Sequence, residues 1–343
     1  MNARPPSKAR DAFVNQGADA YRLKKKPGLL QALAELLADD TAGDPITGLK
    51  WTHKSIRKLA AQLQPKFTVG RTALRRLLRS QRYALRVNRK RLSRQHDPQR
   101  DQQFRYIARQ RCKFQKAGFP VLSVDTKKKE LIGNFKNPGR TWRQTPLDVL
   151  ATDFLNDALG KAMPYGIYDL ARNAGYVVVG TSHETADFAI AAIRSWWLAV
   201  GRHLYLSCTE LLLEADSGGA NGNRVWLWKV GLQRLADEFG LSITVTHYPT
   251  GTSKWNPIEH RLFCYISGNW AGRPLRAYET MLKFIRTTQT EHGLSCRAQL
   301  DRTVYQTRLK VTATEKAQLN LQRHRTLPKY NYTIRPRVPF TKK

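Results

Sequence analysis

The chain has 343 residues, of which 59 are Lys or Arg and 26 are Asp or Glu, so its formal net charge is +33 at pH 7. A hydrophobic content of 41% with eight Trp excludes a solvated basic tail and provides for two or three domains, each with its own core. The excess of positive charge favours a polyanion as the partner.

The sequence gives no sign of a membrane or secreted protein. No stretch reaches the ~18 uninterrupted apolar residues of a membrane-spanning helix, and the first ten residues are polar and basic, without the apolar core of a secretory signal. The four cysteines are scattered and form no Cys-x-x-Cys pair, which argues against a zinc finger. We therefore expect a cytoplasmic protein with free thiols and no membrane contact.

The first third of the chain has helical patterns around a basic surface. After a loose basic N-terminus at 1–28, a helical region spans 29–116, with a helix-turn-helix pattern at 55–63 and 71–80 and a basic linker at 82–94. Leucines recur on one face of both predicted helices. A recognition helix would use the basic side chains on the other face to contact phosphates and bases, and the alternative is a solvated basic face. The candidates are Arg57, Arg71, Arg75, Arg76 and Arg79.

From residue 117 the pattern changes to short apolar strands alternating with helices. We predict strands at 121–126, 165–170, 176–180, 211–216 and 242–248. A capping-box spacing at 181–184 opens one helix, a second covers 221–239, and a third begins at Pro257. The order β-β-β-α-β-α-β-α is that of a mixed α/β sheet of the ribonuclease H-like class, which we assign to 117–308. The rest, 309–343, is predicted to be a basic tail.

Three acidic residues occupy the ends of these elements. Asp125 ends the first strand, Asp216 ends the fourth, and Glu259 lies at the start of the last helix. In the predicted sheet the first and fourth strands are neighbours, so their carboxyl ends bring the acids together. Such carboxylates would hold a pair of divalent cations for phosphoryl transfer, which inside a very basic protein indicates an enzyme that cuts or joins nucleic acid.

Each acid also has a simpler interpretation. An Asp at a strand end often starts a turn, and an acid in the first turn of a helix can complement the helix dipole. Asp169 and Glu214 are competitors for the same role, and Glu214 shares a strand face with Asp216. We leave both outside the predicted triad.

Residues suited to DNA follow the acids directly. Lys127, Lys128 and Lys129 come after Asp125, and a glycine-rich loop at 217–222 comes after Asp216. Before Glu259, Lys254 would hold a phosphate and Trp255 would stack on an unpaired base, although Trp255 is equally compatible with a core position.

At these motifs the chain resembles bacterial insertion-sequence transposases of the DDE class, specifically the ISAzo-type family. The likeness spans roughly residues 50–335. Its main motifs are Ser123-Val124-Asp125-Thr126-Lys127, Ala215-Asp216-Ser217-Gly218-Gly219 and Trp255-Asn256-Pro257-Ile258-Glu259.

The resemblance implies that Asp125, Asp216 and Glu259 are both the catalytic residues and the ligands of two Mg²⁺ ions, for which Mn²⁺ substitutes. It implies DNA strand cleavage and strand transfer at the inverted repeats that end a mobile element. The expected partners are double-stranded terminal-repeat and target DNA and further copies of the chain on that DNA, in association with the nucleoid. Two alternatives stay open: a non-catalytic helix-turn-helix regulator that needs no metal, and a ribonuclease H-like nuclease or integrase.

Overall fold

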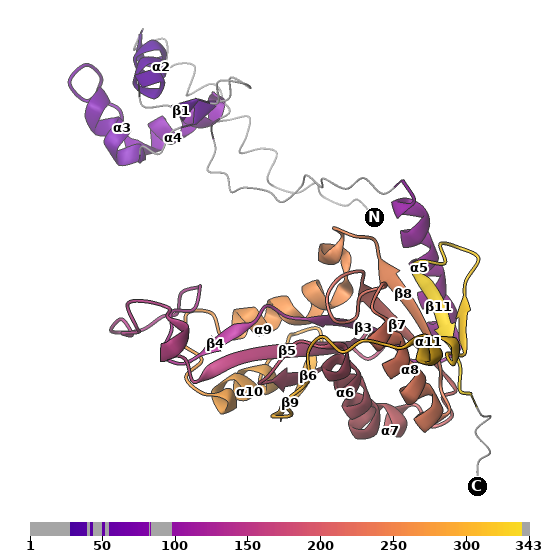
Figure 1. Cartoon of the computed structure of the whole chain (residues 1–343). Helices are drawn as coiled ribbons and strands as arrows, with labels where there is room; N and C mark the ends of the chain where they lie inside the picture. Colours follow the sequence, from indigo (N-terminus) through magenta and orange to yellow (C-terminus); the bar gives the residue numbers. More distant parts are fainter. Residues whose placement is uncertain are drawn as a thin grey trace, which may run out of the picture. The chain divides into compact units, whose positions relative to one another are not determined.

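The computed structural model describes residues 28–39, 42–43, 50–51, 55–81, 83 and 98–337. The chain divides into two compact units, Met1–Leu92 and Ser93–Lys343 (Figure 1). Most of the expected loose N-terminus, nearly all of the basic linker at 82–94, and residues 338–343 lie outside the described residues.

The first unit is a small helical cluster, as the leucine pattern predicts. It contains α2 (Leu29–Asp39), β1 (Ala42–Gly43), β2 (Lys50–Trp51), α3 (Ile56–Leu63) and α4 (Arg71–Ser80). The side chain of Ser55 accepts a hydrogen bond from the Lys58 N–H at 3.2 Å and so begins α3 as an N-cap. Its core consists of leucines, Leu29, Leu33, Leu37, Leu59, Leu63, Leu74 and Leu77.

The second unit is built on one mixed sheet. Its strands are β3 (Val121–Thr126), β4 (Glu130–Ile132), β5 (Gly160–Asp169), β6 (Ala174–Gly180), β7 (Glu210–Asp216), β8 (Ser242–Tyr248), β9 (Ser295–Asp301), β10 (Leu321–Arg323) and β11 (Asn331–Ile334). They pair in the order β10-β11-β8-β7-β3-β5-β6-β9, with β4 beside β5. β3, β7 and β8 are parallel, while β5 is antiparallel to β3 and β6. The strand order and directions confirm the predicted ribonuclease H-like fold.

Helices cover both faces of this sheet (Figure 1). On one face α6 (Ala186–Trp196) and α8 (Trp226–Phe239) pack over the large core around Val124, Ile167 and Leu213. On the other face the helical segment of η5 (Glu259–Phe263) and α9 (Cys264–Asn269) packs with α10 (Tyr278–Arg286) against β5 and β6. The remaining short helical segments are η2 (Leu155–Asp157), η3 (Trp197–Gly201), α7 (Arg202–Leu204), η4 (Ser253–Trp255) and α11 (Ala313–Ala317).

α5 (Arg100–Lys116), which the sequence groups with the N-terminal helices, packs against β3, β7 and β8 of the sheet. Phe114 of α5 is buried against Val121 and Leu212. Because side chains alternate along a strand, Val121 lies on the same sheet face as Ser123 and Asp125. α5 therefore covers the face of the sheet to which Asp125 belongs.

The segment expected to be a basic tail contributes two short strands to the sheet. β10 and β11 extend its edge beyond β8, and all four residues of β11 are buried. Tyr332 and Ile334 enter the core beside α8. The strand is only four residues long and has basic neighbours, so its apolar pattern is too short to stand out in the sequence.

Two helices begin later than their sequence patterns suggest. α6 is capped by Thr185, whose side chain accepts from the Phe188 N–H at 3.2 Å, because the Thr181 N–H is engaged by the Asp301 carbonyl at 3.2 Å. α8 begins at Trp226, after a loop in which Gly222 and Val225 form turns. Among the described residues, no helix is both long enough and apolar enough to cross a membrane.

Candidate active site

Asp125 and Asp216 lie side by side at the carboxyl edge of the sheet. β3 and β7 are parallel, and Val124 is the register partner of Ala215, so the next residue on each strand is one of the two aspartates. Burial raises the pKa of the Asp125 carboxyl, and the charges of Asp216 and Glu259 raise it further. Burial and Glu259 also raise the pKa of Asp216. The three predicted acids therefore act on one another electrostatically across one small region.

Glu259 reaches this region because a glycine on β5 lets its helix come close. Gly166 is the register partner of Asp125. A Cβ atom at this position would lie 2.5 Å from the Phe263 ring and 2.8 Å from Ile258. The segment Glu259–Phe263 has π-helical geometry, a local widening that is frequent at functional sites. Burial raises the pKa of Glu259, whereas Lys127 and His260 lower it.

A buried amide, which the sequence patterns did not single out, joins the two aspartate strands to the Glu259 helix. Asn256 is fully buried and donates to the Asp216 Oδ1 atom at 3.2 Å and to the Val124 carbonyl at 3.4 Å. The Ser123 hydroxyl donates to the Asn256 Oδ1 atom and accepts from the Ile258 N–H, the latter at 3.0 Å. Asn256 therefore fixes the Asp216 carboxylate relative to the start of the helix. Its only sequence signal is the Asn-Pro pair before that helix.

The backbone of Asp216 is held from the other side. The Nδ1 atom of His247 lies 2.9 Å from the Asp216 carbonyl, and its Nε2 atom lies 3.3 Å from the Tyr332 hydroxyl. Burial lowers the pKa of His247 to about 4, so the ring is neutral at pH 7, and a carbonyl partner assigns its proton to Nδ1. The Trp228 Nε1 atom donates to the same Tyr332 hydroxyl at 3.1 Å. The C-terminal strand thus helps to position Asp216.

The two competing acids have structural partners instead. Glu214 is fully buried, receives two hydrogen bonds from Arg111 at 2.8 and 2.6 Å, and accepts a third from the Tyr248 hydroxyl at 2.8 Å. Asp169 accepts from two backbone N–H groups in the β5–β6 turn and from the Tyr205 hydroxyl at 2.7 Å. Asp169 pairs with Leu122, at the opposite end of β3 from Asp125.

The lysines after Asp125 differ in their surroundings. Lys127 is buried, lies 3.0 Å from Glu130, and is 4.6 Å from the centre of the Trp270 ring. Lys129 pairs with Glu184 at 2.9 Å, and the charge of Glu184 also raises the pKa of Asp125. Lys128 is exposed. Lys127, Lys128, Glu130 and Glu259 line part of a pocket of about 380 Å³ beside the acids.

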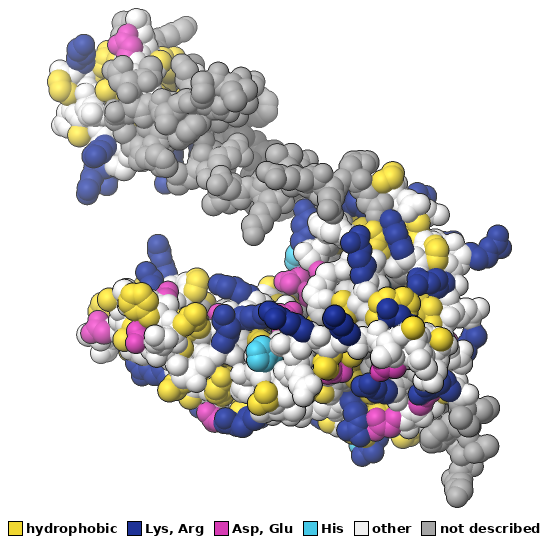
Figure 2. Space-filling model, in the orientation of Figure 1, with side chains coloured by type: hydrophobic (Ala, Val, Ile, Leu, Met, Phe, Trp, Pro, Cys, Tyr) yellow, Lys and Arg dark blue, Asp and Glu magenta, His cyan; other side chains and the backbone are white. Residues whose placement is uncertain are grey.

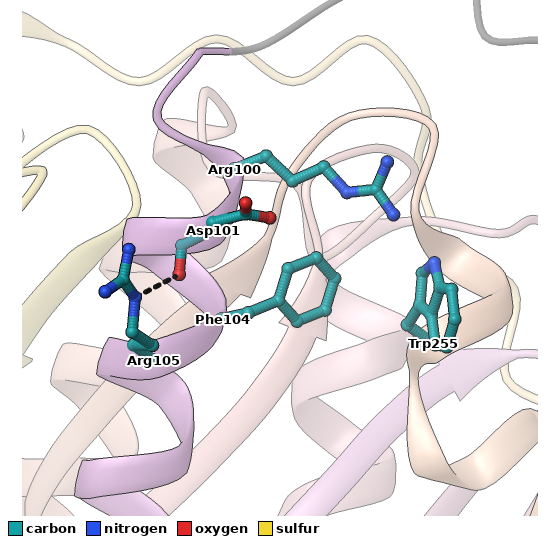
Figure 3. A pocket seen from close by; sticks show the side chains of 5 residues that line it. All are labelled: Arg100, Asp101, Phe104, Arg105 and Trp255. Carbon is teal, nitrogen blue, oxygen red and sulfur yellow. Dashed lines mark hydrogen bonds between the residues drawn. The ribbon is translucent and has the colours of Figure 1, made fainter.

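Trp255 is not a core residue, because 51% of it is exposed. Its ring meets Phe104 of α5 edge to face, with centroids 6.2 Å apart, and the Arg100 guanidinium lies 5.6 Å from the Phe104 centroid. These three side chains border a pocket of about 460 Å³ together with Asp101 and Arg105 (Figure 3). The ammonium of Lys254 lies 5.4 Å from the Trp255 ring centre, and the Lys254 carbonyl is the partner of His260.

The arginines predicted to contact DNA occupy the helices of the first unit. Arg57, Arg71, Arg75 and Arg79 are exposed, and Arg76 is half-buried. Segment 55–81 contains no acidic residue. In the second unit, Lys and Arg side chains spread over the face shown in Figure 2, with few acidic side chains between them.

The donor set at the sheet edge fits Mg²⁺, although no ready-made cage is present. Within the ranges that the structure describes, no three His, Cys, Asp or Glu side chains are close enough together to hold a metal ion by themselves. Mg²⁺ in phosphoryl-transfer sites takes one or two carboxylates and completes its shell with water and substrate phosphate. Asp125, Asp216 and Glu259 supply oxygens of that kind.

Comparison with known proteins identifies the family. Residues 32–336 match the family described as "Rhodopirellula transposase DDE domain". The chain belongs to this family of DDE transposases. The match confirms the resemblance read from the sequence motifs. No curated protein matches the chain.

Among solved structures, the chain is similar to complexes of the Mos1 transposase. The Mos1 paired-end complex with left transposon end has a TM-score of 0.43 and 14% identity, with 83% of this chain and 72% of that chain covered. The Mos1 strand transfer complex has a TM-score of 0.41 and 16% identity, with 83% and 71% covered. A mariner Mos1 paired-end complex with Mg has a TM-score of 0.41 and 15% identity, with 83% and 72% covered.

Proposed function

We propose that this transposase-family chain binds the inverted repeats at the ends of its mobile element and catalyses Mg²⁺-dependent strand cleavage followed by strand transfer. The observation that carries the proposal is the juxtaposition of Asp125 and Asp216 on parallel neighbours, with Glu259 brought against them over Gly166. Their mutual effect on pKa supports a common task.

In this proposal Asp125, Asp216 and Glu259 hold two Mg²⁺ ions, and Mn²⁺ substitutes for them. When bound, such ions activate the attacking oxygen and stabilise the leaving oxygen of an in-line displacement. Asn256 and Ser123 keep the carboxylates in place, while His247 and Tyr332 hold the Asp216 backbone. The first attack uses water and the second uses the freed 3′-hydroxyl, so the same acids serve hydrolysis and strand transfer.

Basic side chains around the acids would position the DNA. Lys127, Lys128, Lys129 and Lys254 lie next to the acids in the sequence, and Lys127 and Lys128 line the pocket beside Glu259. We assign them to phosphates of the cleaved strand, and Trp255, with its exposed ring, to an unpaired base. Arg57, Arg71, Arg75, Arg76 and Arg79 would bind the terminal repeat, and the chain would act as a homo-oligomer on DNA.

The test uses the full chain with labelled element-end DNA in Mg²⁺, and it maps both strand breaks and new joints. Wild type should cut at the element end and join that end to target DNA. Asp216→Asn should do neither, whereas Asp169→Asn, which changes a buried acid of β5 next to the far end of β3, should retain both activities. Breaks without joints would indicate a nuclease, and specific binding without metal-dependent breaks would indicate a regulator.

A further inference from the structure

A second, strongly basic hollow lies beside the loops that follow Asp216 and Tyr248. It has a volume of about 510 Å³. Ser217, which follows Asp216, and Thr250, which begins the loop toward Glu259, form part of its wall. Its other charged walls come from the region around the start of α8, from the end of β10 and from the turn between β10 and β11. None of its lining residues, all of which are described, is acidic, and four are cations: Arg224, Lys229, Arg323 and Lys329.

Lys229 is a buried ammonium group in this wall. Only 3% of the residue is exposed. Its Nζ atom donates to the Asn223 carbonyl at 2.5 Å and lies 5.1 and 5.5 Å from the ring centres of Trp226 and Tyr332. In the described part of the chain no carboxylate pairs with Lys229. Buried charges are normally paired, so the Lys229 ammonium is suited to an anionic group supplied by a ligand.

The groups around Lys229 make the hollow more positive. Arg323 and Lys229 line the same hollow, and burial and the charge of Arg323 lower the pKa of Lys229 to about 8. The Arg323 Nη1 atom donates to the Pro328 carbonyl at 3.1 Å, and neither Arg323 nor Arg224 forms an ion pair with a described acid. α8 begins here without a side-chain cap, so its first N–H groups add positive potential.

The surroundings favour a phosphate group over a nucleobase. Trp226 is the tryptophan in the wall, and the ammonium groups of Lys229 and Lys316 lie 5.1 and 5.3 Å from its ring centre. Its aromatic surface is therefore already in contact with cations. A phosphate needs charge and N–H or O–H donors, which this hollow offers in quantity.

We propose that this hollow binds backbone phosphates of the DNA strand that runs past Asp216. The inference rests on the proposed function, since it assumes that DNA reaches the acidic edge. Because Ser217 directly follows Asp216 and Thr250 lies in the loop that leads to Glu259, a phosphate held here sets the position of the strand relative to the acids. Gly222 keeps the first loop compact, because a Cβ atom there would lie 2.9 Å from the Ser217 carbonyl oxygen.

The test measures the affinity of the full chain for element-end DNA over a range of salt concentrations. The double variant Arg224→Ala, Arg323→Ala removes two exposed cations and leaves the buried Lys229 in place. The slope of log affinity against log salt should decrease by about 1.8, at about 0.9 for each phosphate that the variant no longer neutralises. The control is Arg302→Ala, an exposed arginine just after β9, at the opposite edge of the sheet, which pairs with Glu279 at 3.6 Å. Its slope should equal that of wild type.

A second measurement locates the bound phosphate by replacing single phosphates of the strand near the cleaved bond with neutral methylphosphonates. At one or two positions the replacement should weaken wild-type binding and should not weaken binding by the double variant. An unchanged salt slope in the double variant, in a chain that still cleaves, would overturn the phosphate pocket alone. The phosphate pocket for DNA would also be overturned if the double variant no longer bound inorganic phosphate but bound DNA as wild type does. The hollow would then be a site for a free anion. Failure of wild type to bind or cleave the DNA would instead count against the proposed function.

Discussion

Two acidic side chains on β7 lie two residues apart and have opposite surroundings. Glu214 is fully buried and its charge is matched by Arg111 of α5, with Tyr248 as a further donor. Asp216 receives one amide hydrogen bond from Asn256, and its nearby charged groups are the other acids. The first arrangement joins a helix to the sheet, and the second holds uncompensated negative charge at a loop-lined edge. Glu214 and Asp216 are both carboxylates, so residue type does not distinguish them. The hydrogen-bond donors around each carboxylate make Glu214 a structural acid and leave Asp216 as a candidate metal ligand.

The largest effect should come from the three acids at the sheet edge. Asp125→Asn, Asp216→Asn and Glu259→Gln each remove a charge that the proposed ions need, at a cost of several kcal/mol in the transition state. The rate of end cleavage should fall by about a thousandfold or more, while affinity for end DNA in the absence of metal is kept or increased. Single-turnover cleavage assays measure the rate. A variant that cleaves at a near-normal rate would remove that residue from the site.

Removing the counter-ion of Glu214 should instead lower the stability of the fold. Arg111→Ala leaves Glu214 buried without its counter-ion, which should lower the free energy of unfolding by about 3 kcal/mol. We expect the lower end of the stability loss that is usual when one partner of a buried ion pair is removed, because the Arg111 side chain is 31% exposed. Arg109→Ala, an exposed arginine on the same helix, should change stability by less than about 0.5 kcal/mol. Denaturant unfolding measures both. Equal stability of the two variants would show that Arg111 does not anchor α5.

Asn256 supports the Asp216 carboxylate, and its replacement should have an intermediate effect. Asn256→Ala removes the donor to Asp216 and the partner of Ser123. Loss of such a supporting hydrogen bond typically costs about 10–100-fold in metal affinity or activity, so the Mg²⁺ concentration for half-maximal cleavage should rise. Asn156→Ala, at an exposed amide in η2, is the amide control and should leave that concentration unchanged. If Asn256→Ala lowered stability but not metal response, Asn256 would be a purely structural residue.

The smallest effect should come from Trp255. Its exposed ring contributes little to the core, so Trp255→Ala should leave stability unchanged. Loss of base stacking should weaken binding to end DNA with unpaired bases at the cleavage site by about 1–3 kcal/mol. Binding to fully paired DNA should change less, and Trp255→Phe should restore part of the loss. Trp142→Ala, which changes a fully exposed tryptophan between β4 and β5, is the control. An equal loss on paired and unpaired DNA would exclude stacking.

The sequence was most informative where local patterns determine structure. Apolar runs marked β3 and β7 closely enough to place Asp125 and Asp216 at their ends, and the leucine spacing marked α3 and α4. The ribonuclease H-like succession of strands and helices then predicted that β3 and β7 are neighbours. These features depend on residues within one element or its neighbours, so they can be predicted without the fold.

What the sequence did not reveal depends on distant partners. Arg111 meets Glu214 across 103 residues, and His247 meets Tyr332 across 85. The pairing of β11 with β8 is likewise a long-range interaction made by a strand of four residues. Nor does any local pattern distinguish Glu214 from Asp216, because both lie on one strand face and only α5 decides which charge is compensated.

Asp125, Asp216 and Glu259 are proposed to hold the divalent ions together. The most direct measurement is the anomalous X-ray scattering of Mn²⁺ in crystals of the full chain bound to element-end DNA. We expect Mn²⁺ peaks within coordination distance of these three carboxylates and none at Glu214 or Asp169. Mn²⁺ bound at Glu214, or DNA cleavage in the crystal without a peak at the sheet edge, would contradict it.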